Sequence, residues 1–227
     1  IVTAAVLLLI LGYWIDLKHG EASPWVFWAV IVLAGVTLLA AVLRLWNLGN
    51  PHSLVFDETY YVKDSWTLLH LGYESSWPEE PNPDFEAGHV DGFLTSPAFV
   101  VHPPLGKWLI ALGLAVFGAE DSVGWRISTA VAGIIAVALV CLAAWMLFRS
   151  TTLATIAGGL MAIDGHAIVL SRVSLLDNFL MLFALLGFIA VLLDRWHSQR
   201  RLEGWLAARN GRPKDLGPAL WWRPWLI

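Results

Sequence analysis

Two adjacent carboxylates, Asp57 and Glu58, open a long acidic segment that lies between strongly apolar stretches. This segment runs from residue 55 to residue 107 and closes with the sequence His-Pro-Pro-Leu-Gly-Lys. A carboxylate within hydrogen-bond reach can take the proton from an attacking hydroxyl group. Because neighbouring side chains on a helix diverge, we expect Asp57 and Glu58 to have different roles. The alternative is that both carboxylates only stabilise the N-terminus of a helix.

Cationic side chains border the same segment and are candidates for binding an anionic substrate: Arg44, His102, Lys107, Arg126 and Arg172. Ionisable groups at membrane depth are costly, which makes them functional candidates. For Arg44 and Arg126, the alternative is a charge that reaches back to the membrane surface. Asp177 is a further candidate for contacting the substrate, and its alternative is a cap or loop role.

Metal and cofactor signals are weak in this sequence. Acidic residues and His102 could hold a divalent cation, but they show no recognisable ligand spacing. There is no Gly-rich phosphate loop, nucleophile elbow or Cys/His zinc pattern. The only cysteine, Cys141, lies in an apolar run, so no intramolecular disulfide can form. We assign no metal ligands and no cofactor, and a divalent cation stays an alternative.

The composition is that of an integral membrane protein. Hydrophobic residues make up 58% of the chain and charged residues 14%, with a mean hydropathy of +0.66. Soluble domains have about 45–50% apolar and about 25% charged residues. The 14 tryptophans suit a protein with many membrane–water boundaries. We expect membrane lipid as a neighbour and no nucleic acid as a partner.

Apolar runs of spanning length predict an all-α polytopic bundle. We expect membrane-spanning helices at about residues 25–46, 123–148, 153–170 and 173–193. Residues 1–24, an apolar segment and its connector, are left without a role. Residues 25–227 are expected to be the N-terminal part of one membrane domain in a longer protein. Short helices are expected at residues 57–71 and 105–117, within an outer loop of about residues 47–121, and the residues between them are expected to be irregular.

The distribution of basic residues predicts the orientation. Residues 195–218 are rich in Arg and Lys, whereas the loop at 47–121 is strongly acidic. Basic loops stay in the cytoplasm. We therefore expect a multi-pass protein of the plasma membrane whose acidic loop lies on the extracytoplasmic side.

Several motifs in this order resemble the protein O-mannosyltransferases, with the closest likeness to their actinobacterial members. They are Arg-Leu-Trp-Asn-Leu-Gly (44–49), Phe-Asp-Glu-Thr-Tyr-Tyr (56–61), His-Pro-Pro-Leu-Gly-Lys (102–107), Gly-Trp-Arg (124–126) and Ser-Arg-Val-Ser-Leu-Leu-Asp-Asn-Phe-Leu (171–180). The likeness covers about residues 25–227, which we expect to be roughly the first half of such an enzyme. Residues 1–15 lie upstream of the family's usual first span.

The resemblance implies a GT-C fold, with two juxtamembrane helices and the active site in the first outer loop. It also implies an inverting transfer of mannose from polyprenyl-phosphate mannose to Ser or Thr hydroxyls of secreted proteins, with the secretion translocon as a candidate presenter. Asp57 matches the family's catalytic acidic position, and Glu58 matches its partner. Arg44 and Arg126 match arginines that the family needs. We expect Arg126, with His102 or Lys107, to stabilise the departing phosphate.

Two alternatives stay open. Another lipid-linked-sugar transferase of the same fold, such as one that moves aminoarabinose to lipid A, also has an early acidic site in its first outer loop. A transporter would instead use Arg44, Arg126 and Asp177 as a substrate path. Transporters tend to have broken helices, repeats and charges near mid-membrane. Here the charges cluster at one face, which favours the enzyme.

Overall fold

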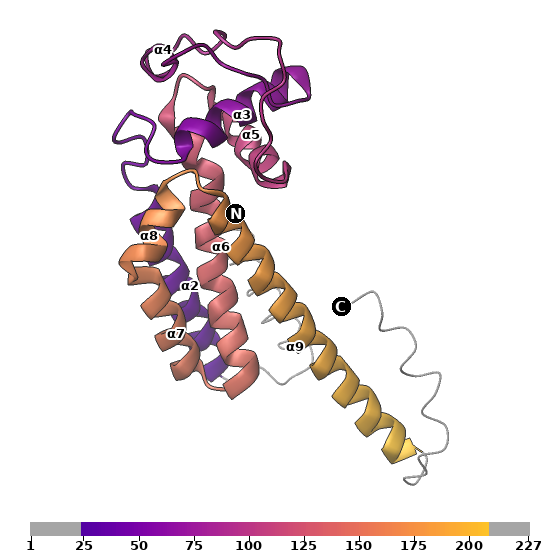
Figure 1. Cartoon of the computed structure of the whole chain (residues 1–227). Helices are drawn as coiled ribbons and strands as arrows, with labels where there is room; N and C mark the ends of the chain where they lie inside the picture. Colours follow the sequence, from indigo (N-terminus) through magenta and orange to yellow (C-terminus); the bar gives the residue numbers. More distant parts are fainter. Residues whose placement is uncertain (1–23, 209–227) are drawn as a thin grey trace.

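The computed structural model describes residues 24–208, in which all the regular elements are helices (Figure 1). The bundle consists of α2 (Pro24–Leu45), α6 (Ser122–Phe148), α7 (Thr151–Ile163), α8 (Gly165–Arg172) and α9 (Leu176–Ala208). The segment between α2 and α6 carries α3 (Glu58–Leu71), α4 (Asn82–Glu86) and α5 (Leu105–Phe117). The predicted all-α membrane architecture is confirmed.

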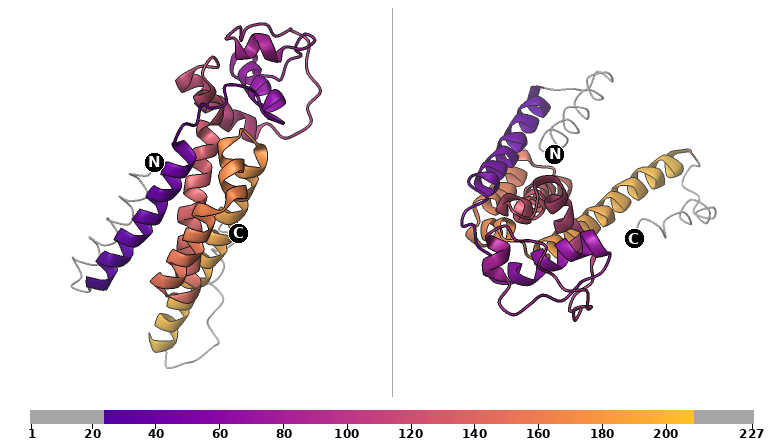
Figure 2. Two further views of the ribbon diagram at one scale, coloured as in Figure 1. Left: turned by 90° about the vertical axis from the view of Figure 1, so that its left-hand side faces the viewer. Right: turned by 90° about the horizontal axis from the view of Figure 1, so that it is seen from above.

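Helix α6 is the centre of the bundle, since it contacts α2, α5, α7, α8 and α9. Small residues allow these close approaches. A side chain at Gly158 would collide with Cys141 of α6, and one at Gly133 would collide with Ser171 of α8. Figure 1 and the right-hand view in Figure 2 show α9 leaning away from the other helices along its length.

Two of the described helices, α6 and α9, are long and apolar enough to cross a membrane. The expected first span is helix α2, of which Ala29–Leu45 counts as a shorter apolar helix. The expected span at 153–170 is a pair of helices that is apolar and long enough for a span only when α7 and α8 are taken together, and the chain bends by 58° between them. Asp164 breaks the helix: it is extended and its carboxylate accepts the backbone N–H of Ala167 at 2.7 Å.

The first part of the expected cytoplasmic loop at 195–218 is helical over the residues that the structure describes. Helix α9 continues past the expected end at residue 193 to Ala208. Its polar continuation is rich in Arg, Leu, Glu and Ala, which favour a helix, and the helix therefore extends beyond the apolar run. Residues 1–23 and 209–227, including the rest of that expected loop, lie outside the described range.

The outer-loop helices at 57–71 and 105–117 are confirmed as α3 and α5, which pack against each other at one end of the bundle (Figure 1). Helix α3 ends at Gly72, whose φ of 78° needs a residue without a side chain. Helix α5 begins after Pro104, as the two prolines predict. The segment expected to be irregular contains the short helix α4.

Candidate active site

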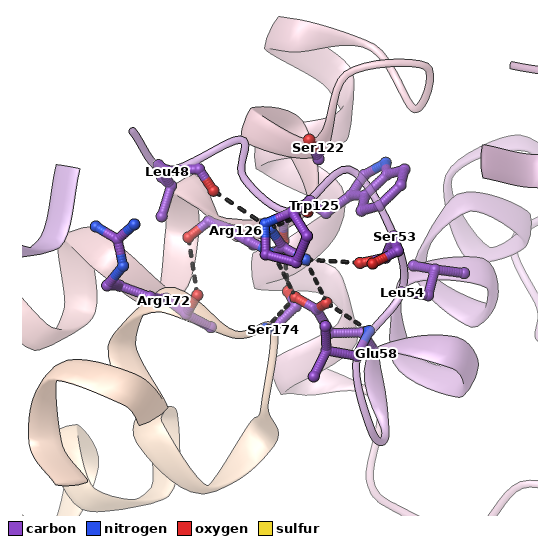
Figure 3. A network of polar contacts seen from close by, with 12 residues as sticks. Leu48, Ser53, Leu54, Glu58, Ser122, Trp125, Arg126, Arg172 and Ser174 are labelled. Atoms are coloured by element: carbon purple, nitrogen blue, oxygen red, sulfur yellow. Dashed lines mark hydrogen bonds and ion pairs between the residues drawn. The ribbon is translucent and has the colours of Figure 1, made fainter. Parts of the chain in front are cut away.

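Glu58 and Arg126 form a buried ion pair where the first turn of α3 meets the first turns of α6 (Figure 3). The Nε and Nη2 atoms of Arg126 donate to Oε1 and Oε2 of Glu58, each at 2.8 Å. Glu58 is 0% exposed and Arg126 is 1% exposed. Two parallel N–H···O bonds are the strongest geometry for such a pair.

The rest of the Arg126 guanidinium is bound by backbone. Nη1 donates to the carbonyls of Leu48 and Pro51, and Nη2 donates to the carbonyl of Ser53 at 2.8 Å. These bonds occupy all five N–H donors of an arginine. Arg126 therefore holds the connecting segment between α2 and α3 in place. It has no N–H donor left for a ligand in this conformation.

Glu58 also joins distant segments. Its carboxylate accepts the backbone N–H of Val55 at 2.9 Å and that of Ser174, just before α9, at 2.8 Å. The N-terminus of α3 is thus tied to α6 and to the turn between α8 and α9. The divergence expected of the two neighbouring carboxylates is confirmed, because Asp57 makes none of these contacts.

Arg44 and Arg172 tie α2 to α7 and α8. Arg44, which is fully buried, donates to Ser171 Oγ at 3.2 Å and to the carbonyls of Met161 and Ala162. Arg172 donates to carbonyls at the end of α2, including that of Trp46 at 2.7 Å. Carbonyls at a helix end lack partners within the helix, so these arginines supply the missing donors.

Lys107 fastens α5 to α3. Its buried ammonium donates to Asp64 of α3 at 2.9 Å and to Glu74 at 2.6 Å. Burial raises the pKa of Asp64 above its ordinary value, although Lys107 opposes that shift. Two carboxylates around one lysine satisfy its charge within the protein.

Asp57 opens onto a cavity of about 490 Å³ beside α3. The cavity is lined by Asp57, Thr59, Tyr60, Tyr61, Lys63, Asp64, Ser75, Ser76, Trp77, Pro81, Ala98, Phe99, Val101, His102 and Lys107. Tyr61 donates a long hydrogen bond of 3.4 Å to Asp57 Oδ2. Burial, then the nearby Asp57 charge, raises the pKa of Tyr61. Among the described residues, no basic nitrogen lies within 4.0 Å of the Asp57 carboxylate.

The expected substrate-binding residues therefore separate into two groups. Asp57, His102 and Lys107 line the cavity, and the His102 ring lies edge-on to Tyr61 with centroids 5.7 Å apart. Arg44, Arg126 and Arg172 do not line it, nor does Asp177, which is exposed on the first turn of α9. Asp177 nonetheless contributes to the raised pKa of Tyr61.

Sequence reasoning missed Lys63, a cavity residue six positions after Asp57. Its ammonium donates to Asn82 Oδ1 at 2.6 Å and lies 5.9 Å from the centre of the Trp77 ring. Burial lowers the pKa of Lys63 to about 8. The spacing of four between Thr59 and Lys63 is visible in the sequence. The cavity that Lys63 lines together with Thr59 and Tyr61 exists only in the folded loop.

No group of three or more His, Cys, Asp or Glu side chains in the described part of the chain is arranged to hold a metal ion. The divalent-cation alternative therefore has no ligand cluster there to support it.

Comparison with known proteins agrees with the motifs. A family model described as dolichyl-phosphate-mannose-protein mannosyltransferase matches residues 101–209. The chain is 38% identical over 213 residues to the polyprenol-phosphate-mannose–protein mannosyltransferase of Mycolicibacterium smegmatis, covering 89% of this chain and 36% of that protein. For the Corynebacterium glutamicum protein of the same name, identity is 36% over 200 residues, or 86% of this chain and 36% of the relative.

The chain belongs to the protein mannosyltransferase family. It spans about a third of the length of these relatives, less than the half that the motifs suggested. A shorter match, 38% identical over 99 residues, is to the undecaprenyl phosphate-alpha-4-amino-4-deoxy-L-arabinose arabinosyl transferase of Pseudomonas savastanoi, covering 43% of this chain and 16% of that protein. No solved structure matches the chain. The motifs on which the resemblance rests contain Asp57 and His102 of the cavity and the Glu58–Arg126 pair beside it.

Proposed function

We propose that the protein containing this chain transfers mannose from polyprenyl-phosphate mannose to Ser or Thr hydroxyls of proteins, with Asp57 as the general base. One observation carries the assignment of the base. Asp57 is a half-buried carboxylate that opens onto the cavity and has no cationic partner among the described residues, whereas its neighbour Glu58 is consumed by Arg126. Relatives named for mannose transfer supply the reaction class.

The chemistry is a single displacement. A Ser or Thr oxygen forms a bond to the anomeric carbon of mannose, and the bond from that carbon to the carrier phosphate breaks. The hydroxyl proton passes to Asp57, and the phosphate leaves with the bonding electron pair. Attack from the face opposite the phosphate inverts the anomeric centre. Negative charge grows on the departing phosphate, so a cation near it lowers the barrier.

The buried arginines have a positioning role in this proposal. The sequence predicted that Arg126, Arg44 and Arg172 contact the donor phosphate or the substrate. In the structure all five donors of Arg126 are engaged by protein groups, and Arg44 and Arg172 donate to backbone carbonyls. The Glu58–Arg126 pair fixes the N-terminus of α3, and with it the position of Asp57. Lys107 fixes α5, which follows His102, against α3.

We propose an extracytoplasmic location for the cavity. The residues that line it belong to the acidic loop. The helices of that loop lie at one end of the bundle, away from the basic C-terminal half of α9 (Figure 1). With that basic half in the cytoplasm of a plasma-membrane protein, the cavity faces the extracytoplasmic side. There the donor's lipid tail stays in the bilayer while a secreted acceptor, delivered by the translocon, arrives from water.

The decisive experiment uses the full-length protein in membranes with radiolabelled polyprenyl-phosphate mannose and a Ser/Thr-rich peptide. Wild type should label the peptide, and Asp57→Asn should not, because it removes the base and keeps the shape. Both proteins should insert and fold alike. Equal labelling by Asp57→Asn would refute the assignment of the base.

A second donor tests the nearest rival. The similarity to an aminoarabinose transferase makes undecaprenyl-phosphate aminoarabinose, with lipid A as acceptor, the appropriate comparison. We expect transfer from the mannose donor to peptide and none from the aminoarabinose donor to lipid A. The opposite result would replace the proposed function with that of the rival.

A further inference from the structure

The cavity beside Asp57 contains three cationic or titratable nitrogen side chains, Lys63, His102 and Lys107, which differ in how fully they are satisfied. Lys107 is bound by two carboxylates. His102 is exposed, and its ring lies edge-on to that of Tyr61. Lys63 has no carboxylate within 4.0 Å among the described residues.

Lys63 is a buried cation held only by neutral groups. It is 6% exposed, and its ammonium donates to Asn82 Oδ1 at 2.6 Å and, more weakly, to Thr59 Oγ1 at 3.5 Å. An ammonium has three N–H donors, so one is left over. Charges that are removed from water are normally paired, because an unpaired one is costly. An unpaired cation lining an open cavity is a site that an anion would complete.

We propose that Lys63 binds the phosphate of the lipid-linked donor and neutralises the charge that grows on it as the sugar leaves. This inference rests on the proposed function for the identity of the ligand. In this proposal the residue that contacts the phosphate is Lys63 of α3 and not one of the arginines. Asp57 directly precedes α3, so the base and the phosphate contact would lie on the same wall of the cavity.

The rim of the cavity favours a lipid phosphate over free phosphate. Three of its lining residues present apolar or aromatic side chains at the surface: Tyr60, Phe99 (89% exposed) and Val101. Large exposed apolar side chains beside a polar cavity suit an amphiphilic ligand whose tail leaves along the rim. Free phosphate would make no use of them.

The ionisation of Lys63 agrees with this arrangement. Burial lowers its pKa to about 8, while the charges of Asp64 and Glu86 act in the opposite direction. A bound phosphate would stabilise the charged form and raise the pKa again. Without a bound donor, Lys63 is therefore protonated to a smaller extent at alkaline pH than an ordinary lysine. Binding of the donor would then be accompanied by uptake of a proton by Lys63.

The test is donor binding by the full-length protein in detergent, measured with radiolabelled polyprenyl-phosphate mannose and no acceptor. The variant is Lys63→Met, which keeps the length of the side chain and removes the charge. We expect the donor Kd to rise by about tenfold to a hundredfold. Inorganic phosphate should compete poorly, since it lacks the tail.

Folding and acceptor measurements separate this role from others. Lys63→Met should not lower the Tm, because it removes a buried ammonium that no carboxylate pairs. The KM for the acceptor peptide should not change. An unchanged donor Kd, or a change in the acceptor KM alone, would overturn the inference, and the latter would point to recognition of acidic acceptors. Strong competition by inorganic phosphate would refute the preference of the site for a lipid-linked phosphate.

The two proposals fail separately. Asp57-dependent transfer with an unchanged donor Kd in Lys63→Met would refute the role of Lys63 and leave the mannosyltransferase reading intact. Lys63-dependent binding of polyprenyl-phosphate mannose without any transfer by wild type would refute the proposed mannosyltransferase reaction and support the role of Lys63 in binding the donor.

Discussion

Replacing Arg126 by Met tests whether the buried ion pair holds the active-site loop in place. The variant leaves Glu58, which is 0% exposed, as a buried charge without its cation. Breaking a buried pair in this way costs about 3–5 kcal/mol. The carbonyls of Leu48, Pro51 and Ser53 also lose their donor, and each one that water does not reach adds about 1–3 kcal/mol. Because the effects of neighbouring groups are not additive, we do not sum these values. We expect Arg126→Met to lower the free energy of unfolding by at least about 3–5 kcal/mol.

The assay is thermal unfolding of the purified full-length protein in detergent, followed by tryptophan fluorescence. A loss of 1 kcal/mol lowers the Tm of a domain of 150–250 residues by about 2–4 °C and that of a longer protein by less, so we expect a Tm for Arg126→Met several degrees below that of wild type. Arg149→Met is the matched control. Arg149 is exposed, and its guanidinium contacts only the Trp145 and Trp196 rings among the described groups, so its loss should change stability by less than about 1 kcal/mol.

The outcome distinguishes a positioning arginine from a phosphate ligand. If Arg126→Met had the Tm of wild type and a donor Kd many times higher, Arg126 would bind the phosphate and our reasoning from its saturated donors would be wrong. A conservative variant sharpens the comparison. Arg126→Lys keeps the charge but lacks the planar fork, so it should recover only part of the lost Tm.

Two further predictions concern the lysines of the cavity. Lys107→Met leaves the Asp64 and Glu74 carboxylates without their shared cation and should destabilise the packing of α3 on α5 by about 3–5 kcal/mol, seen as a lower Tm; a Tm equal to that of Lys63→Met would contradict it. Donor affinity should be highest below pH 8 and fall as the pH rises above it, because Lys63 loses its charge near pH 8 in the empty site; the same titration of Lys63→Met should lack this step.

Much of the helical layout was readable from hydropathy. The apolar runs predicted α2, α6 and the membrane part of α9, and the prolines before Leu105 predicted the start of α5. Hydropathy did not predict the bend of 58° at Asp164, where one carboxylate caps a new helix within an apolar run. It also did not predict that α9 continues beyond residue 193, because polar residues can end an apolar run without ending a helix.

The sequence by itself determined the family and the segment in which we propose the chemistry, because those depend on residue types and their order along the chain. It placed Asp57 and His102 in one loop, and the structure puts both on one cavity. Only the tertiary structure decided how each charge is used. Whether a guanidinium is free for a phosphate depends on which carbonyls and carboxylates surround it, and those come from residues far away in sequence, as for Arg126 and Glu58. Lys63 became a candidate for the same reason: its charge is ordinary in the sequence, but no carboxylate of the described residues pairs with it in the fold.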